Sequence, residues 1–79
     1  MANGGYDAED IRSRIQDLVY GTLIDKIRRD PFPSATMMNM VEAGASETQM
    51  RDYVGVLLKK VAGEQFPSMD MLKRVTRLV

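Results

Sequence analysis

The chain has 79 residues, enough for one small domain and too few for two independent hydrophobic cores. It contains no cysteine and no histidine, which excludes disulfides, thiolate zinc sites and nucleophilic sites that pair serine or cysteine with histidine. Eleven basic residues balance eleven acidic ones, so the net charge gives no general attraction to nucleic acid or to an anionic membrane.

The N-terminal residues 1–6 are small, polar and rich in glycine, and we expect them to form a flexible tail. They lack the basic and apolar regions of a leader peptide, and the apolar runs elsewhere are too short to span a membrane. We therefore expect a cytoplasmic protein with no membrane segment, in which residues 7–79 form a single domain.

A first helix is predicted from about Asp7 to Arg29. The carboxylate of Asp7 is suited to cap its N-terminus. Arg28 and Arg29 suit the negative end of the helix dipole, and Pro31 prevents the helix from continuing.

A second and a third helix follow. Ser34 is the predicted N-cap of the second helix, which ends near Gly44 or Ser46. Ser46 is also the predicted N-cap of the third helix, over residues 47–62, with Gly63 as its C-terminal stop. One apolar face is expected on the third helix, formed by Met50, Tyr53, Val54, Leu57, Leu58 and Val61.

A fourth helix is predicted over residues 69–78, after the N-cap Ser68. Its apolar residues are Met71, Leu72, Val75, Leu78 and Val79. Its basic residues lie on another side: Lys73, Arg74 and Arg77. The fourth helix should pack back on the third.

The first and second halves of the chain resemble each other. The segment 21–27 corresponds to 55–61, and the triplet Phe-Pro-Ser at 32–34 returns at 66–68, so the offset is constant at 34. A fixed period of this size indicates one supersecondary unit used twice. We predict an all-α fold of four helices: two tandem helical hairpins, with one unit over about 7–45 and the other over about 46–79, related by a pseudo-twofold axis and packed in a compact arrangement. The period is also that of tetratricopeptide repeats, but the Trp, Gly and Tyr spacing of their consensus is absent.

The first predicted helix carries two apolar faces. Residues 20, 23, 24 and 27 form the face that the repeat predicts as core. Ile11, Ile15 and Leu18 lie well over a quarter-turn away and have no apolar counterpart in the second half. Two interpretations stay open: these three residues pack against the second hairpin, or they form a surface for another chain, most simply a second copy.

Glycine and the Phe-Pro-Ser triplets mark the repeat. Gly21 and Gly55 occupy matched positions within helices, where glycine is unfavourable, so we expect another backbone to approach them closely, either where the two hairpins cross or from a partner helix. In each triplet, proline and serine should end one helix and start the next, while Phe32 and Phe66 pack on the hairpins they close.

Seven methionines are present, and most are expected to fill the core. Met40 and Met69 lie toward the edges of their helix faces, so they are candidates for contact with a partner.

The acidic residues are explained by helix capping and dipole roles, and neither GxGxxG nor GxxxxGK[ST] occurs. We therefore expect no catalytic residue, no cofactor and no metal. The function that we predict is that of a protein–protein interaction or regulatory adaptor domain that homodimerises through Ile11, Ile15 and Leu18. The alternative is a small DNA-binding regulator, in which the third and fourth helices form a helix-turn-helix and Lys73, Arg74 and Arg77 contact nucleic acid.

Overall fold

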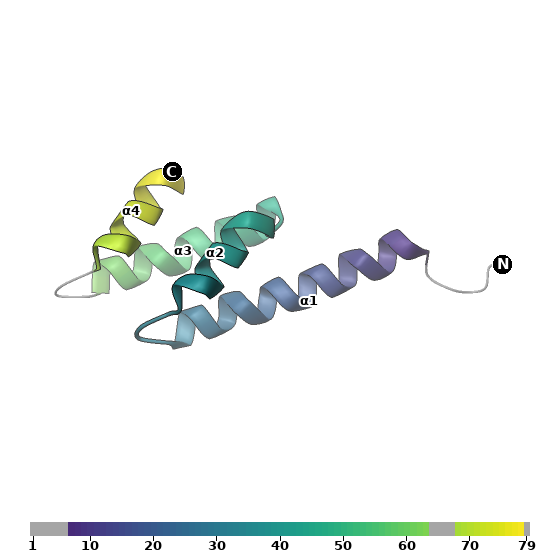
Figure 1. The fold of residues 1–79 in the computed structure, drawn as a ribbon, viewed down its shortest axis with the longest axis horizontal. Coiled ribbons are helices and arrows are strands. Elements are labelled where there is room, and N and C mark those ends of the chain that lie inside the picture. Colours follow the sequence, from purple (N-terminus) through teal and green to yellow (C-terminus); the bar gives the residue numbers. More distant parts are fainter. Residues whose placement is uncertain (1–6, 64–67, 79) are drawn as a thin grey trace.

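The computed structural model describes residues 7–63 and 68–78. Over these residues the chain is all-α, with four helices and no strand: α1 Ala8–Arg29, α2 Ala35–Gly44, α3 Glu47–Gly63 and α4 Met69–Leu78 (Figure 1). The predicted helix positions are therefore confirmed. The predictions for the tail, for the triplet residues Phe66 and Pro67, and for Val79 lie outside the described residues.

Helix N-caps explain where the elements begin. The Asp7 carboxylate accepts from the backbone N–H of Asp10 at 2.8 Å, and Ser34 and Ser68 accept from Met37 and Met71 at 3.3 and 3.0 Å. Ser46 and Gln49 form a reciprocal capping box at the start of α3. Each cap satisfies a backbone donor that the first turn of a helix leaves without an intrahelical partner.

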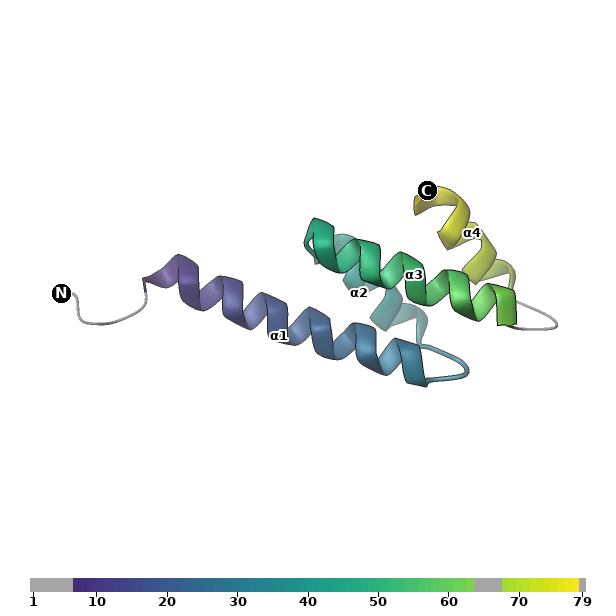
Figure 2. The same cartoon turned by 180° about the vertical axis from the view of Figure 1, so that it is seen from behind.

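The helices form two hairpins, α1–α2 and α3–α4, which we call hairpin 1 and hairpin 2. Figures 1 and 2 show α1 and α3 side by side and running in the same direction, with α2 and α4 folded back across them. Polar contacts join α3 to α1 and its connector along their length. Gln49 donates to the Asp17 carbonyl at 3.2 Å, and the Lys60 ammonium donates to the Asp30 carbonyl at 2.7 Å. Helix α3 therefore lies along hairpin 1.

One core joins the two hairpins. Its buried apolar members are Ile24, Ile27, Met38, Val41, Tyr53, Val56, Leu57 and Met71. The predicted face of α3 is correct for Tyr53 and Leu57, but the helix is rotated so that Val56 is buried and Leu58 is 47% exposed.

Two packing predictions are wrong. A Cβ atom at Gly21 or Gly55 would meet nothing within 4 Å, so no backbone in the described part of the chain approaches either glycine, and the expected crossing of the two hairpins there is wrong. An approach by a partner helix stays a prediction. The close approach occurs at Gly44, where a Cβ would overlap the Tyr20 ring. Phe32 does not pack on its hairpin: its side chain is 89% exposed, while its backbone N–H donates to the Asp30 carboxylate at 2.9 Å.

Candidate functional site

The N-terminal part of α1 carries three exposed apolar side chains on one side. Ile11, Ile15 and Leu18, which we call the α1 strip, are 46%, 56% and 71% exposed. Of the two interpretations of these residues, packing against the second hairpin is therefore wrong. Val19, beside the strip, is also exposed.

Helix α1 joins the rest of the fold only from about its third turn onward. The Gln16 amide donates to the Gly44 carbonyl at 2.7 Å, next to the point where the Tyr20 ring lies over Gly44. The earlier turns project beyond the ends of α2 and α3 (Figures 1 and 2). Ile11 thus lies on the projecting helix end (Figure 1), while Ile15 lines a groove beside Gly44 at the point where α1 joins the fold.

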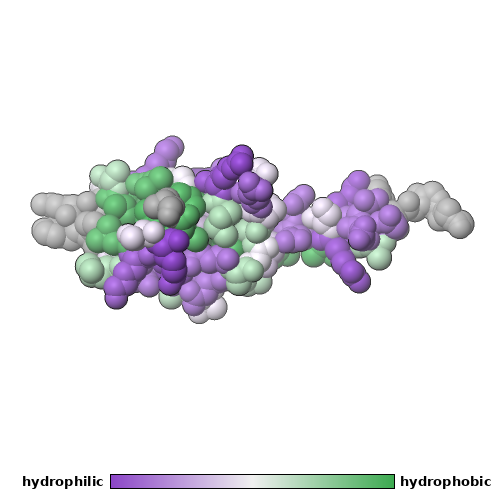
Figure 3. Space-filling model, turned by 90° about the horizontal axis from the view of Figure 1, so that it is seen from above, coloured by the Kyte–Doolittle hydropathy of each residue, from purple (hydrophilic) through white to green (hydrophobic). Residues whose placement is uncertain are grey.

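Hairpin 2 has a second open apolar surface. A groove of about 510 Å³ is lined by Ala45, Glu47, Met50, Arg51, Val54 and Leu78, and we call it the α3–α4 groove. Leu58 lies one turn beyond Val54 on the same side of α3. Figure 3 shows apolar atoms gathered over this end of the molecule, bordered by hydrophilic ones. Helical periodicity predicted Val54 and Leu58 as core residues, whereas the structure leaves Leu58 open.

A polar cluster connects α2, α3 and α4. The Glu42 carboxylate accepts from the Tyr53 hydroxyl at 2.5 Å and from the Arg74 guanidinium at 2.8 Å, and Arg74 also donates to Asp70 at 2.8 Å. Arg77 reaches the other Glu42 oxygen from the surface at 3.2 Å. Arg74 is only 4% exposed, and no buried side-chain polar atom among the described residues lacks a partner.

Burial and hydrogen bonding set the charge states in this cluster. Burial raises the pKa of Tyr53 above its ordinary value, and the hydrogen bond to Glu42 raises it further, so the hydroxyl remains a donor. Burial alone would lower the pKa of Arg74, but its hydrogen bonds to Asp70 and Glu42 outweigh this and the net pKa is raised. A charged Arg74 held between carboxylates has a structural role in joining α4 to α2.

This cluster corrects one set of predicted site residues. Arg74, a candidate for contact with nucleic acid, is buried and bound by Glu42 and Asp70, whereas Lys73 and Arg77 are exposed. For Glu42, the sequence predicts only a capping or dipole role at a helix end. The signal for Arg74 is its spacing, since it lies at i+3 from the buried Met71 within the apolar stripe of α4.

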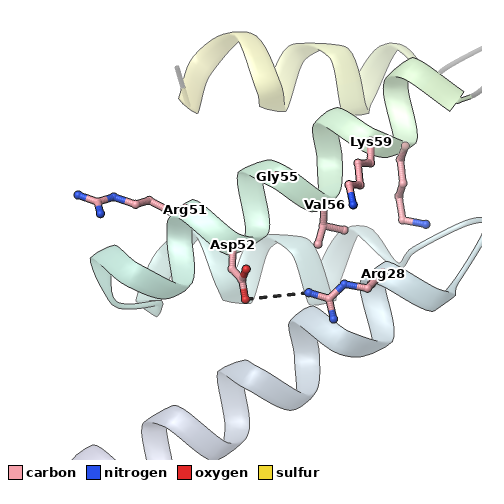
Figure 4. Close-up of a pocket in the computed structure, with 7 residues that line it drawn as sticks. Arg28, Arg51, Asp52, Gly55, Val56 and Lys59 are labelled. Atoms are coloured by element: carbon pink, nitrogen blue, oxygen red, sulfur yellow. Dashed lines mark ion pairs between the residues drawn. The ribbon is translucent and has the colours of Figure 1, made fainter.

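Basic side chains gather in a groove between α1 and α3. Figure 4 shows this groove, about 390 Å³ in volume and lined by Arg28, Arg51, Asp52, Gly55, Val56, Lys59 and Lys60. Most of its charged groups have partners within the chain. The Arg28 guanidinium lies 3.2 Å from the Asp25 carboxylate and 4.0 Å from that of Asp52. The Arg51 guanidinium lies 3.2 Å from the Glu47 carboxylate, and the Lys60 ammonium donates to the Asp30 carbonyl. Two of these contacts, Arg28–Asp52 and Lys60–Asp30, join α1 and its connector to α3, and the other two lie within one helix.

The remaining predicted contact residues are Met40 and Met69. Met40 is exposed on α2 and Met69 on the first turn of α4. Their accessibility agrees with a contact role, which stays a prediction.

Some other kinds of site are absent from the described part of the chain. Within residues 7–63 and 68–78, no three acidic side chains gather in a way that could hold a metal ion. None of the four helices described combines the length and the apolar character that crossing a bilayer requires.

Comparison with protein-family models, curated proteins and solved structures gives no significant match. The fold of the described residues thus defines the class of the protein, all-α with four helices.

Proposed function

We propose that this chain is a non-catalytic helical interaction protein that forms homodimers through the α1 strip. The observation that carries the proposal is the exposure of Ile11, Ile15 and Leu18 on one side of the N-terminal part of α1. A helix normally turns its apolar side toward a partner, and here the partner is not hairpin 2. An apolar patch that a small domain leaves open is typical of an interaction site.

Size supports association as well. A domain of 79 residues buries a modest fraction of its surface and gains stability by joining another chain. Symmetric homodimers are the commonest oligomers of soluble proteins, so a second copy is the simplest partner.

The two hairpins are, in this proposal, two copies of one tandem unit. Helices α2 and α4 both begin directly after a serine N-cap. The first residues of the two helices are separated by the same number of positions as the two Phe-Pro-Ser triplets, and so are their last residues. Since α1 and α3 run in the same direction, a side-by-side stack describes the two units better than the pseudo-twofold relation expected from the sequence (Figures 1 and 2).

Ile15→Glu tests the proposed dimer, because a charge in the middle of the strip would have to be buried in the interface. We expect sedimentation velocity to show self-association of the wild-type chain and its loss in the variant, with unchanged helicity by circular dichroism. Ser13→Glu is the matched control, since it adds the same charge to the same exposed helix end on the opposite side. A wild-type chain that stays monomeric at high concentration, or an Ile15→Glu variant that associates normally, would contradict the proposal.

A further inference from the structure

Hairpin 1 and hairpin 2 differ in what covers them. Tyr20, Ile24 and Ile27 belong to the core face of hairpin 1, along which α3 lies. The equivalent positions of the second half are Val54, Leu58 and Val61, and of these Leu58 is exposed and the other two are only partly buried. In a stack of tandem units each unit covers the open face of its neighbour, and the last face needs another cover.

We propose that the α1 strip of a second copy docks in the α3–α4 groove, in the place that a further unit would occupy. This inference rests on the proposed homodimer and specifies the surface that receives the strip. The contact joins two different surfaces of the same chain, so a closed twofold dimer contains it twice, with the strip of each copy in the groove of the other.

The packing of α3 along hairpin 1 shows which apolar spacing a helix needs to pack on a hairpin of this chain. Helix α3 buries Tyr53, Val56 and Leu57, at positions i, i+3 and i+4, where it lies along hairpin 1. The α1 strip and its neighbour offer apolar residues with the same spacing: Ile15, Leu18 and Val19, all exposed. Both sets therefore present a similar apolar ridge.

Charge favours the same pairing. Residues 7–18 contain four acidic and two basic side chains, a formal charge of −2. The described residues of hairpin 2, 47–63 and 68–78, contain six basic and three acidic side chains, a formal charge of +3, of which Glu42 of α2 neutralises one. The charged residues that line the groove, Glu47 and Arg51, pair with each other, so the attraction comes from the hairpin as a whole. Opposite charges should favour the strip over the groove and disfavour two strips lying side by side.

A mixing experiment tests this contact. Ile15→Glu destroys the strip and keeps the groove. Leu58→Glu keeps the strip and places a charge on the exposed apolar surface that continues the groove one turn beyond its lining residue Val54. We expect each variant alone to lose self-association by about 30-fold or more, as for a central interface residue. An equimolar mixture should form a 1:1 complex, because one intact strip then meets one intact groove.

Controls separate association from folding. Thr48→Glu adds the same charge to an exposed position of α3 about a quarter-turn away from Leu58, and Leu58→Ser is a milder change at the groove. Each variant must keep wild-type helicity by circular dichroism. We expect Thr48→Glu to associate like the wild type and Leu58→Ser to associate more weakly.

The outcomes distinguish the two proposals. If Ile15→Glu is monomeric while Leu58→Glu associates normally, the strip pairs with another surface, and only the groove assignment is wrong. The same assignment is wrong if both variants are monomeric and their mixture forms no complex. If only Leu58→Glu loses association, both proposals are wrong, because the strip is then not part of the interface. A monomeric wild-type chain would overturn both proposals.

Discussion

Hairpin 1 and hairpin 2 have similar sequences but bury different residues. Ile24 is 2% exposed, whereas Leu58, at the equivalent position of the second half, is exposed. The reverse holds for Met40, which is exposed, and Arg74, which is buried. The two halves thus have helices and serine caps at corresponding positions, while burial depends on whether a neighbouring hairpin covers the face.

The polar cluster of Glu42, Tyr53 and Arg74 is a further difference between the two hairpins. Tyr53 and Arg74 correspond to Val19 and Met40 in the other half, and Glu42 corresponds to Thr76. Hairpin 1 thus has no equivalent of the tyrosine and arginine that bind Glu42. The cluster is specific to the contact between α2 and hairpin 2.

Among the variants considered, removal of the Glu42 side chain, which joins α2 to hairpin 2, should have the largest effect on stability. In Glu42→Ala the buried Arg74 keeps only the exposed Asp70, and the Tyr53 hydroxyl loses its acceptor. We expect the free energy of unfolding to fall by about 3 kcal/mol or more, as when a buried pair loses one partner. That is a large part of the roughly 4–12 kcal/mol expected for a domain of this length.

Urea denaturation followed by circular dichroism measures this effect. Arg77→Ala is the matched control, because Arg77 binds the same carboxylate from the surface, and its loss should cost less than about 1 kcal/mol. Similar small losses for both variants would show that the cluster contributes little to the contact.

Truncation of Ile24 and of Leu58 compares two apolar positions that correspond in the aligned halves of the sequence. Ile24→Ala should lower the free energy of unfolding by about 2–4 kcal/mol, because it leaves a cavity in the core. Leu58→Ala should cost less than about 1 kcal/mol, since the side chain already meets solvent. Both are measured at a protein concentration at which sedimentation shows the monomer, so that association does not contribute. Equal losses would mean that Leu58 is covered within its own chain.

Local features of the chain were predicted well from the sequence. Serine after proline, aspartate before an acidic first turn and glycine after an apolar run each act within a few residues, so the helix positions followed directly. The sequence also singled out Ile11, Ile15 and Leu18 as a second face of α1, and their exposure now supports the surface interpretation.

Tertiary features were predicted less well, because they depend on residues far apart in the chain. Arg74 is buried only because Glu42, 32 positions earlier, meets it across the fold. Leu58 shares an apolar face with Tyr53 and Leu57, but the rotation of α3 that leaves it exposed is set by packing along hairpin 1. Helical periodicity gives the width of an apolar face and does not say which part of it another helix covers.

The matched glycines give the smallest expected effect. Since open space surrounds the Cβ position of Gly21 and of Gly55, Gly21→Ala and Gly55→Ala should each raise the free energy of unfolding by up to about 1 kcal/mol through helix propensity alone. Gly44→Ala should lower it, because the new methyl group must displace the Tyr20 side chain that packs against the core. The same denaturation experiment measures all three variants. A loss of stability of the monomer in Gly21→Ala or Gly55→Ala would contradict the open space around these Cβ positions. If Gly55→Ala lowered stability only at concentrations at which the chain associates, α3 would contact the other copy on the side away from the α3–α4 groove as well.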